Sequence, residues 1–296
     1  MATSQRGTGG DMGGKVVLIT GANTGIGLVT ARALCQRGAQ VFIACRSAVT
    51  GEAALATVRA AVPGAQVELL PLDLGDFASV RACAEGFLAR SLPLHVLINN
   101  AGLAGGKGLT KSGFELAFGT NHLGHFLLTD LLLDCIKATA AKDGTARIVT
   151  VASRAHYRVK PVAGGIDWAA LQRPTNTLTG IAEYGISKLA NVLFSAELSR
   201  RLAGSGVTTY ALHPGVVASD VWRAVPWPFQ SLIKLRMITV EEGALTSLFC
   251  ATSPQLATES GLYYDKCQSR TPSILGQDFA LAQALWQKSE DWVKAK

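Results

Sequence analysis

The sequence predicts a single doubly wound α/β domain, with a mainly parallel β-sheet and helices on both of its faces. Three observations support this. The 296 residues are 48% hydrophobic and 17% charged, a composition typical of a globular chain with a large core. Short apolar runs alternate with segments of helix-forming residues, as buried parallel strands alternate with covering helices. The first apolar run ends in a loop with three glycines, which is typical of a tight turn between a strand and a helix.

Six strands are expected, each a short apolar run, and a helix is expected after each of the first five. No internal repeat and no Pro- or Ser-rich linker interrupts the alternation, so residues 15–296 are predicted to form one domain. Residues 1–14 are rich in Gly, Ser and Thr and are expected to form a flexible tail. The predicted strands are 15–20, 40–45, 67–72, 94–98, 147–151 and 207–212, and the predicted helices 28–37, 53–61, 79–90, 121–137 and 184–202.

Two stretches depart from this alternation and are expected to be functional loops. Residues 154–182 hold several prolines and glycines and little periodicity. The second loop, about 221–240, contains Trp222, Trp227 and Phe229 beside two prolines. These aromatic side chains fit a roof over an apolar substrate pocket as well as they fit packing of the loop onto the domain.

Composition and charge exclude several function classes. The net charge is +7, but Lys and Arg are dispersed and form no basic run with interleaved aromatics, so nucleic-acid binding is not expected. The six cysteines include no Cys-x-x-Cys pair, which favours a reducing, cytoplasmic location. His122, His125, His156 and His213 lack the spacing of a zinc motif, so no metal site is expected. No signal peptide or membrane-spanning segment is visible.

The glycine loop after the first strand suggests an anion site. Glycine lets the backbone approach a phosphate closely, and the following helix directs free N–H groups at it. Gly21, Gly25 and Gly27 are the loop glycines, and Asn23, Thr24 and Ile26 lie between them. A glycine loop alone is also found in ordinary strand-to-helix turns.

Further motifs follow the later strands. Asn99-Asn100-Ala101-Gly102 follows the fourth strand, Ser153 the fifth and Pro214-Gly215 the sixth, and Tyr184 precedes Lys188 by four residues. With Thr-Gly-x-x-x-Gly-x-Gly at 20–27, this ordered set resembles the short-chain dehydrogenase/reductase family over about residues 15–220. Phe-Gly-Thr-Asn-His-Leu-Gly-His-Phe and Ser-Lys-Leu-Ala-Asn-Val-Leu-Phe are similar to the branch of retinol dehydrogenases and retinal reductases. The resemblance implies a Rossmann-like domain, a nicotinamide cofactor and oxidoreductase activity.

Tyr184 and Lys188 would share one face of a helix, where the ammonium group is expected to lower the pKa of the tyrosine. Tyr184 is the predicted general acid/base, and the resemblance implies that Lys188 also holds the nicotinamide ribose. Ser153 would donate a hydrogen bond to the substrate oxygen, with Ser187 and Thr150 as nearby polar alternatives. Asn121 matches the family asparagine that binds a water in the proton relay. The alternatives are an exposed helix face for the Tyr–Lys pair, a strand-end cap for Ser153 and a structural role for Asn121.

Arg46 favours NADP(H) as the cofactor, because a basic residue after the second strand accommodates the 2′-phosphate where an acidic one would bind the ribose of NAD. Asp73 resembles the family acid at the adenine, and Asn99 and Gly102 are expected to line the adenosine side. The full set predicted to contact the cofactor is Gly21, Asn23, Thr24, Gly25, Ile26, Gly27, Arg46, Asp73, Leu74, Asn99, Ala101, Gly102, Tyr184, Lys188, Pro214, Gly215 and Val217.

Together these features predict an NADP(H)-dependent oxidoreductase that interconverts a lipophilic aldehyde or ketone and its alcohol. The alternatives are a steroid dehydrogenase and a non-catalytic NADP-binding sensor or scaffold of the same fold. A homo-oligomer is expected by analogy with the family. Retinoid-active members commonly start with a hydrophobic anchor, which this sequence does not show, so peripheral contact with a membrane is the only membrane association expected.

Overall fold

A computed structural model describes residues 10–160, 165–217 and 237–295. Within them, eight strands form one sheet in the order β3-β2-β1-β4-β5-β6-β7-β8. Every neighbouring pair is parallel except β7 and β8, which are antiparallel. The strands are β1 (Val16–Thr20), β2 (Gln40–Cys45), β3 (Val67–Pro71), β4 (Val96–Asn99), β5 (Ala146–Val151), β6 (Val207–His213), β7 (Leu262–Asp265) and β8 (Gln268–Arg270).

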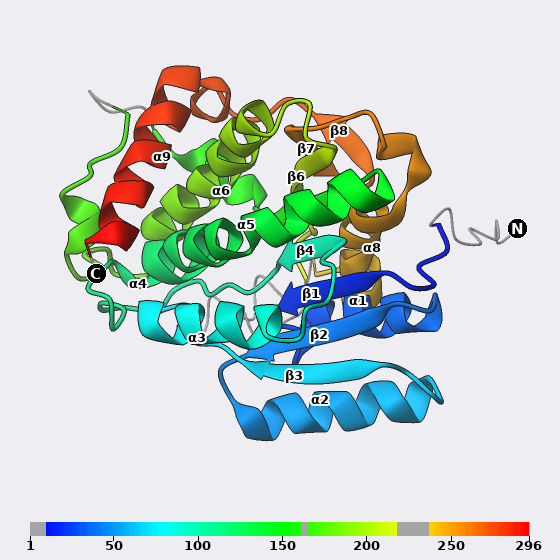
Figure 1. Cartoon of the computed structure of the whole chain (residues 1–296). Coiled ribbons are helices and arrows are strands. Elements are labelled where there is room, and N and C mark those ends of the chain that lie inside the picture. The colour runs from blue at the N-terminus through cyan, green and yellow to red at the C-terminus, as the bar shows by residue number, and fades with distance from the viewer. Residues whose placement is uncertain (1–9, 161–164, 218–236, 296) are drawn as a thin grey trace, which may run out of the picture.

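Helices cover both faces of the sheet (Figure 1). On one face α1 (Gly25–Gln36), α2 (Ala48–Ala61) and α8 (Val240–Thr252) pack on the odd-numbered side chains of β1, such as Val17 and Ile19. On the other, α3 (Phe77–Leu88), α5 (Gly124–Asp143) and α6 (Ile181–Arg201) pack on Val16 and Leu18, with α9 (Phe279–Lys294) outside α6. The predicted doubly wound sheet is therefore confirmed.

The chain after β6 adds elements that the alternation did not predict. Strands β7 and β8 extend the sheet beyond β6, so the expectation of six strands was too low for the described residues. Helix α8 begins with a capping box, in which Thr239 accepts from the backbone of Glu242 and the Glu242 side chain accepts from Thr239. Helix α9 buries Leu281, Leu285 and further residues at helical spacing.

Several predicted boundaries differ from the structure. Asn121 is not in the long helix itself but in a π-helical turn, Gly119–Leu123, which continues the short helix α4 (Leu116–Phe118) and leads into α5. Helix α5 runs to Asp143 and ends at Gly144, whose backbone is left-handed. The loop 154–182 contains two short 3₁₀ turns, Arg154–Arg158 and Ala170–Gln172, and α6 already begins at Ile181.

The predicted flexible tail and the predicted substrate loop are only partly described. Of the expected tail, residues 1–9 lie outside the described residues, but residues 10–14 dock on the domain. Gly10 donates to the Thr252 carbonyl at 3.2 Å, Met12 donates to Arg37 at 3.0 Å, and the Met12 side chain is buried. Of the expected substrate loop, residues 218–236 and their aromatic side chains lie outside the described residues, whereas Ile238 pairs with Val217 and Val240 begins α8.

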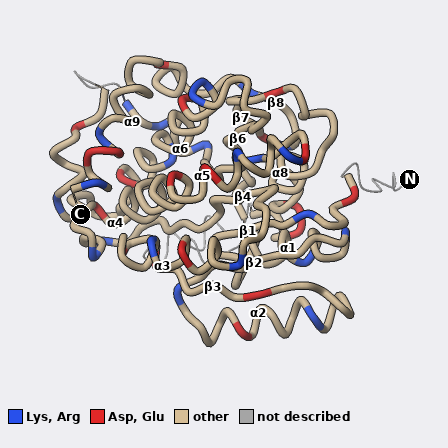
Figure 2. The backbone as a smooth tube through the Cα atoms, viewed as in Figure 1, with Lys and Arg blue, Asp and Glu red and all other residues tan. Residues whose placement is uncertain are grey.

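The chain order of the strands reverses between β1 and β4, and the carboxyl ends of these and the neighbouring strands meet at one edge of the sheet. Ligands of such sheets bind at this edge, near the reversal point. Among the described residues, no helix is long and apolar enough to span a membrane. All six cysteines carry free thiols, with Cys45 buried as expected. Figure 2 shows Lys and Arg spread over many elements, with Asp and Glu among them.

Candidate active site

The glycine loop forms a close-packed turn between β1 and α1. Gly21 has φ of +65°, and a Cβ there would lie 2.8 Å from Ala101 Cα. A Cβ at Gly27 would lie 2.7 Å from the Gly21 carbonyl oxygen and 2.6 Å from Asn100 Nδ2. The sequence therefore needs glycine at both positions. Thr24 precedes α1 in an extended conformation, and within the described residues no side chain caps the helix, which leaves its first N–H groups for an anion.

The second helix of this face lies beside the same loop. Asn23 Nδ2 donates to Thr50 Oγ1 of α2 at 3.0 Å, and Ser47 caps α2 by accepting from the Thr50 backbone. Arg46 is exposed between β2 and α2, two residues after Ala44, whose carbonyl accepts from Gly21 N at 2.7 Å. The predicted 2′-phosphate residue and the glycine loop are thus neighbours.

The Asn-Asn-Ala-Gly loop is fixed by Thr20, the last residue of β1. Thr20 Oγ1 accepts from the backbone N–H groups of Asn100 at 2.9 Å and Ala101 at 3.0 Å. Asn100 Nδ2 donates to the Thr20 carbonyl at 2.8 Å. Asn99 differs from its expected role: its side chain is fully buried and donates to Thr129 of α5, so it points away from the groove. Only its backbone faces the carboxyl edge.

The remaining predicted cofactor residues lie at the same edge. Asp73 follows β3 and accepts from Gly75 N at 3.0 Å, and Leu74 is buried beside Gly124. Pro214 and Gly215 follow β6, and Val217 forms a parallel bridge with Ile238. The side chain of Ile26, in α1, lies beside Gly243 of α8. The structure brings the predicted set together at one edge, with Asn99 turned inward.

Tyr184 and Ser153 are hydrogen-bonded to one another. Ser153 follows β5 and its Oγ also accepts from Ala155 N at 3.2 Å. Ser187 is committed elsewhere, since its hydroxyl donates to the Tyr184 carbonyl at 2.8 Å. Burial raises the pKa of Tyr184, and the Ser153 hydrogen bond lowers it by less. The net shift is upward, because burial outweighs the lowering effects, so the predicted net lowering of this pKa is not found.

Lys188 explains this difference. Its Nζ lies 5.7 Å from the centre of the Tyr184 ring and donates to the Val151 carbonyl at 2.8 Å. Burial lowers the pKa of Lys188 from 10.5 to about 7, so at neutral pH the amine is protonated only in part of the molecules. Asn191, one turn further along α6, donates to the same carbonyl at 3.1 Å. The lysine is thus held at the end of β5.

Asn121 faces the same space. Its Oδ1 accepts from Leu103 N at 2.9 Å, and its Nδ2 donates to Ser187 Oγ at 2.9 Å. A Cβ at Gly102 would lie 3.4 Å from both Asn121 Oδ1 and Lys188 Nζ, so the glycine leaves these two groups close together. The side chain is fully buried. Each of the four predicted catalytic residues therefore lies within one cluster at the carboxyl edge.

His125 joins this cluster to the Asn-Asn-Ala-Gly loop. Its Nε2 is 2.8 Å from Thr20 Oγ1, and its Nδ1 is 2.9 Å from the Asn121 carbonyl oxygen. Since two backbone N–H groups already donate to Thr20 Oγ1, the Thr20 hydroxyl donates to Nε2, and the proton of the neutral ring is on Nδ1. Thr20, Asn100 and His125 were not among the predicted site residues. All three lie within the motifs that the sequence analysis quoted, which were the signal that could have found them.

The buried histidines predict acid sensitivity. Burial lowers the pKa of His122 to about 3 and that of His125 to about 4, whereas both would titrate near 6.5 in the unfolded chain. Below pH 6.5 the unfolded chain therefore binds more protons than the folded chain. As the pH is lowered, the free energy of unfolding is expected to decrease by up to about 1.4 kcal/mol per pH unit for each histidine. Urea unfolding between pH 7.5 and 5 measures this. The His122 ring lies among Phe118, Phe126 and Phe194. The variant His122→Phe is expected to show a shallower dependence of the free energy of unfolding on pH. Equal slopes for the variant and the wild type would contradict the assignment.

Comparisons with known proteins bear on this geometry. Residues 15–170 match the model of the short chain dehydrogenase family. Human retinol dehydrogenase 12 is 47% identical over 283 residues, which are 93% of this chain and 85% of that protein. The chain belongs to the short-chain dehydrogenase/reductase family. It is an oxidoreductase of a retinol dehydrogenase-like kind, as the ordered motifs predicted.

Other relatives agree with this assignment. Human retinol dehydrogenase 11 is 45% identical over 94% of this chain and 85% of its own length. The crystal structure of a 3-ketoacyl-(acyl-carrier-protein) reductase from Brucella melitensis, complexed with NADH, superposes with a TM-score of 0.67 at 25% identity, over 86% of this chain and 97% of that one. The fold and family are those of nicotinamide-dependent oxidoreductases. Among residues 10–160, 165–217 and 237–295, no three His, Cys, Asp or Glu side chains gather as a metal site.

Proposed function

We propose that this protein is an NADPH-dependent reductase of lipophilic aldehydes or ketones, with Tyr184 as the general acid. The observation that carries the proposal is the cluster of Ser153, Tyr184 and Lys188 at the carboxyl edge of the sheet, the edge at which β1 also leads into the glycine loop and α1. The residues present fit a dinucleotide. Gly21 and Gly27 allow the close-packed turn that leads into α1, whose first N–H groups would bind the pyrophosphate, and Lys188 and Asn121 would face the nicotinamide ribose.

In this proposal each residue has a distinct task. The dinucleotide supplies the hydride. Ser153 donates a hydrogen bond to the carbonyl oxygen as negative charge develops on it, and Tyr184 donates the proton. Because burial raises the pKa of Tyr184, the side chain is protonated at neutral pH, which suits a general acid in the direction of carbonyl reduction. Lys188, protonated in part of the molecules, stabilises the phenolate that remains.

The substrate class is supported by relatives and tested by a panel. The retinol dehydrogenases at 45–47% identity are named for a lipophilic alcohol, and the expected substrate here has the same character. Purified protein with NADPH is mixed with all-trans-retinal, medium-chain aldehydes, a steroid ketone and a small polar aldehyde. We expect consumption of NADPH with the apolar aldehydes. Binding of NADPH without turnover on any member would favour the non-catalytic sensor instead.

Arg46 is proposed to select NADPH over NADH. Arg46→Ala removes the guanidinium group beside the glycine loop, and we expect the Kd for NADPH to rise about 10- to 100-fold while that for NADH stays unchanged. Fluorescence titration with both dinucleotides measures this. Lys142→Ala, which removes an exposed positive charge at the end of α5, serves as the control and should leave both values unchanged. An equal loss for NADH and NADPH would contradict the role of Arg46.

A further inference from the structure

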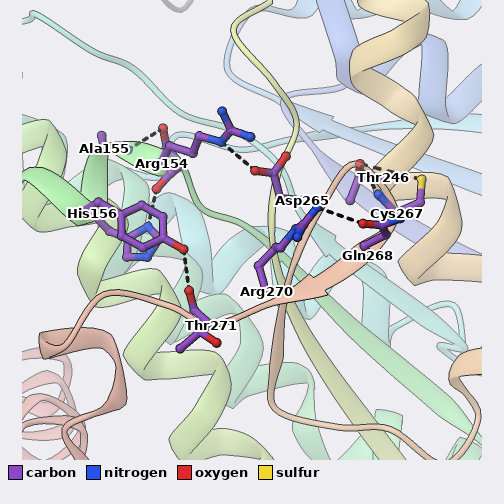
Figure 3. A network of polar contacts seen from close by, with 11 residues as sticks. Arg154, Ala155, His156, Thr246, Asp265, Cys267, Gln268, Arg270 and Thr271 are labelled. Carbon is purple, nitrogen blue, oxygen red and sulfur yellow. Dashed lines mark hydrogen bonds and ion pairs between the residues drawn. The ribbon is translucent and has the colours of Figure 1, made fainter.

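Behind Ser153, a short turn of the chain is tied to the C-terminal part of the domain. Arg154–Arg158 forms a 3₁₀ turn that Ser153 caps. Arg154 Nε donates to Asp265 Oδ2 at 2.6 Å, and Tyr157 donates from its hydroxyl to the Thr271 carbonyl at 2.6 Å. In Figure 3, Arg154 reaches toward Asp265 at the end of β7, and Thr271 lies below the turn on the chain that follows β8. Residues more than 100 positions apart are thereby joined.

His156 lies at the centre of this junction and is completely buried. Its Nε2 is 3.1 Å from the backbone N of Ser273, and its Nδ1 is 2.6 Å from the carbonyl oxygen of Ser153. The Ser273 N–H can only donate, so Nε2 must accept and carries no proton. The Ser153 carbonyl can only accept, so Nδ1 must carry the proton. Burial lowers the pKa of His156, which keeps the ring neutral as this arrangement requires.

The Ser153 carbonyl accepts from the ring of His156 at 2.6 Å and from the backbone N–H of His156 at 3.2 Å. The ring donates to the backbone of Ser153, while Ser153 Oγ accepts from Ala155 N within the same turn and its hydroxyl is hydrogen-bonded to Tyr184. The backbone and side chain of Ser153 are therefore fixed by separate bonds. The His156 ring also packs on the rings of Tyr157 and Tyr263, with ring centres 4.0 and 4.8 Å away. The ring has little room to turn.

We propose that His156 is a positioning residue for the reaction: it holds Ser153 against Tyr184 through the Ser153 carbonyl, and the C-terminal segment sets its tautomer through the N–H of Ser273. The inference rests on the proposed function in that Ser153 and Tyr184 are the reacting pair. According to this inference, the segment 271–273 also helps to position the site. This segment follows the sheet and lies beyond the part of the chain that the family model matches.

Two substitutions separate the two hydrogen bonds of His156. In His156→Asn the amide nitrogen takes the place of Nδ1 and still donates to Ser153, but the bond to Ser273 is lost. In His156→Gln the amide oxygen takes the place of Nε2 and still accepts from Ser273, but the side-chain bond to the Ser153 carbonyl is lost and only the backbone bond remains. Each variant loses one buried hydrogen bond, so similar losses of stability are expected. Tyr157→Phe is the matched control, because it removes the hydrogen bond from the Tyr157 hydroxyl to the Thr271 carbonyl, which does not involve Ser153.

We expect kcat for carbonyl reduction to fall about 10- to 100-fold in His156→Gln and to stay within about threefold of wild type in His156→Asn and Tyr157→Phe. The KM for NADPH should be unchanged in all three. A merely structural role would lower kcat in His156→Asn and His156→Gln alike, and that result, or full activity in His156→Gln, would overturn the inference.

A second readout needs no turnover. The Ala155 N–H is protected from hydrogen exchange by its bond to Ser153 Oγ. Exchange measured by NMR is expected to quicken at Ala155 in His156→Gln and to stay slow in His156→Asn. Unchanged protection in both variants would contradict the inference. Failure of the wild-type protein to reduce any carbonyl would instead contradict the proposed function, and the exchange result would still decide whether His156 holds Ser153.

Discussion

Tyr184→Phe is expected to lower kcat for carbonyl reduction by about 10³-fold or more, with the Kd for NADPH unchanged. The substitution removes only the hydroxyl group. The Tyr184 ring is buried, and phenylalanine would fill the same space. Without the hydroxyl, the developing alkoxide has no proton donor, and the hydroxyl of Ser153 loses its partner. Stopped-flow absorbance of NADPH measures the chemical step, and fluorescence titration measures binding.

The control for this experiment is a tyrosine on another part of the domain. Tyr210 is also fully buried and donates from its hydroxyl to the Leu256 carbonyl at 2.6 Å, on the face covered by α8. Tyr210→Phe should lower stability and leave kcat close to wild type. Turnover by Tyr184→Phe at the wild-type rate would remove Tyr184 from the mechanism.

Lys188→Met is expected to have large effects of opposite sign on activity and stability. Loss of the amine should lower kcat by about 10²- to 10³-fold, because the Tyr184 phenolate loses its stabilising charge. Stability should rise. Burial depresses the pKa of Lys188 from 10.5 to about 7, so the unfolded chain binds more protons than the folded one between these values. The stability of the wild-type protein is therefore reduced at pH 7 and below and recovers as the pH rises toward 10.5.

Methionine at position 188 removes the destabilisation caused by the buried amine, although the hydrogen bond from Lys188 to the Val151 carbonyl is also lost. The net gain in the free energy of unfolding is expected to be on the order of 2 kcal/mol near pH 7 and to shrink toward pH 10.5. Urea unfolding at pH 7 and pH 9.5 gives both values. A variant that is less stable than wild type at pH 7 would contradict the statement that burial of the Lys188 amine destabilises the folded protein.

The first six strands could be predicted because parallel strands buried on both faces are continuous apolar runs, such as residues 40–45 and 146–151. Strands β7 and β8 have four and three residues, and β8 is fully exposed, so neither gives such a run. Helices α8 and α9 did have signals, the Thr239–Glu242 capping box and the apolar spacing of Leu281, Leu285 and Trp286. Both helices follow the sixth strand, beyond the strand–helix alternation that indicates the rest of the fold.

The candidate site was predictable where one local motif places two groups, and less so where distant segments meet. The four-residue spacing of Tyr184 and Lys188 puts both on one side of α6 whatever surrounds them. The side chain of Asn99 turned inward because it ends a strand whose covering helix offers Thr129 as a partner. His125 and His156 reach distant segments through Nε2, at the Thr20 hydroxyl and at the backbone N–H of Ser273. The upward pKa shift of Tyr184 depends on burial, which a sequence motif does not report.

The carboxyl edge is proposed to bring a dinucleotide and a lipophilic carbonyl together for hydride transfer. Transfer of an isotope from the dinucleotide to the product is the direct test of this role. The protein is mixed with NADPH carrying deuterium on the transferable position and with the apolar aldehyde of the panel that reacts fastest, and the product is analysed by mass spectrometry. We expect the wild-type protein, and not Tyr184→Phe, to form an alcohol that is one mass unit heavier than the alcohol formed with unlabelled NADPH. Bound NADPH with no deuterated alcohol from any carbonyl of the panel would contradict it.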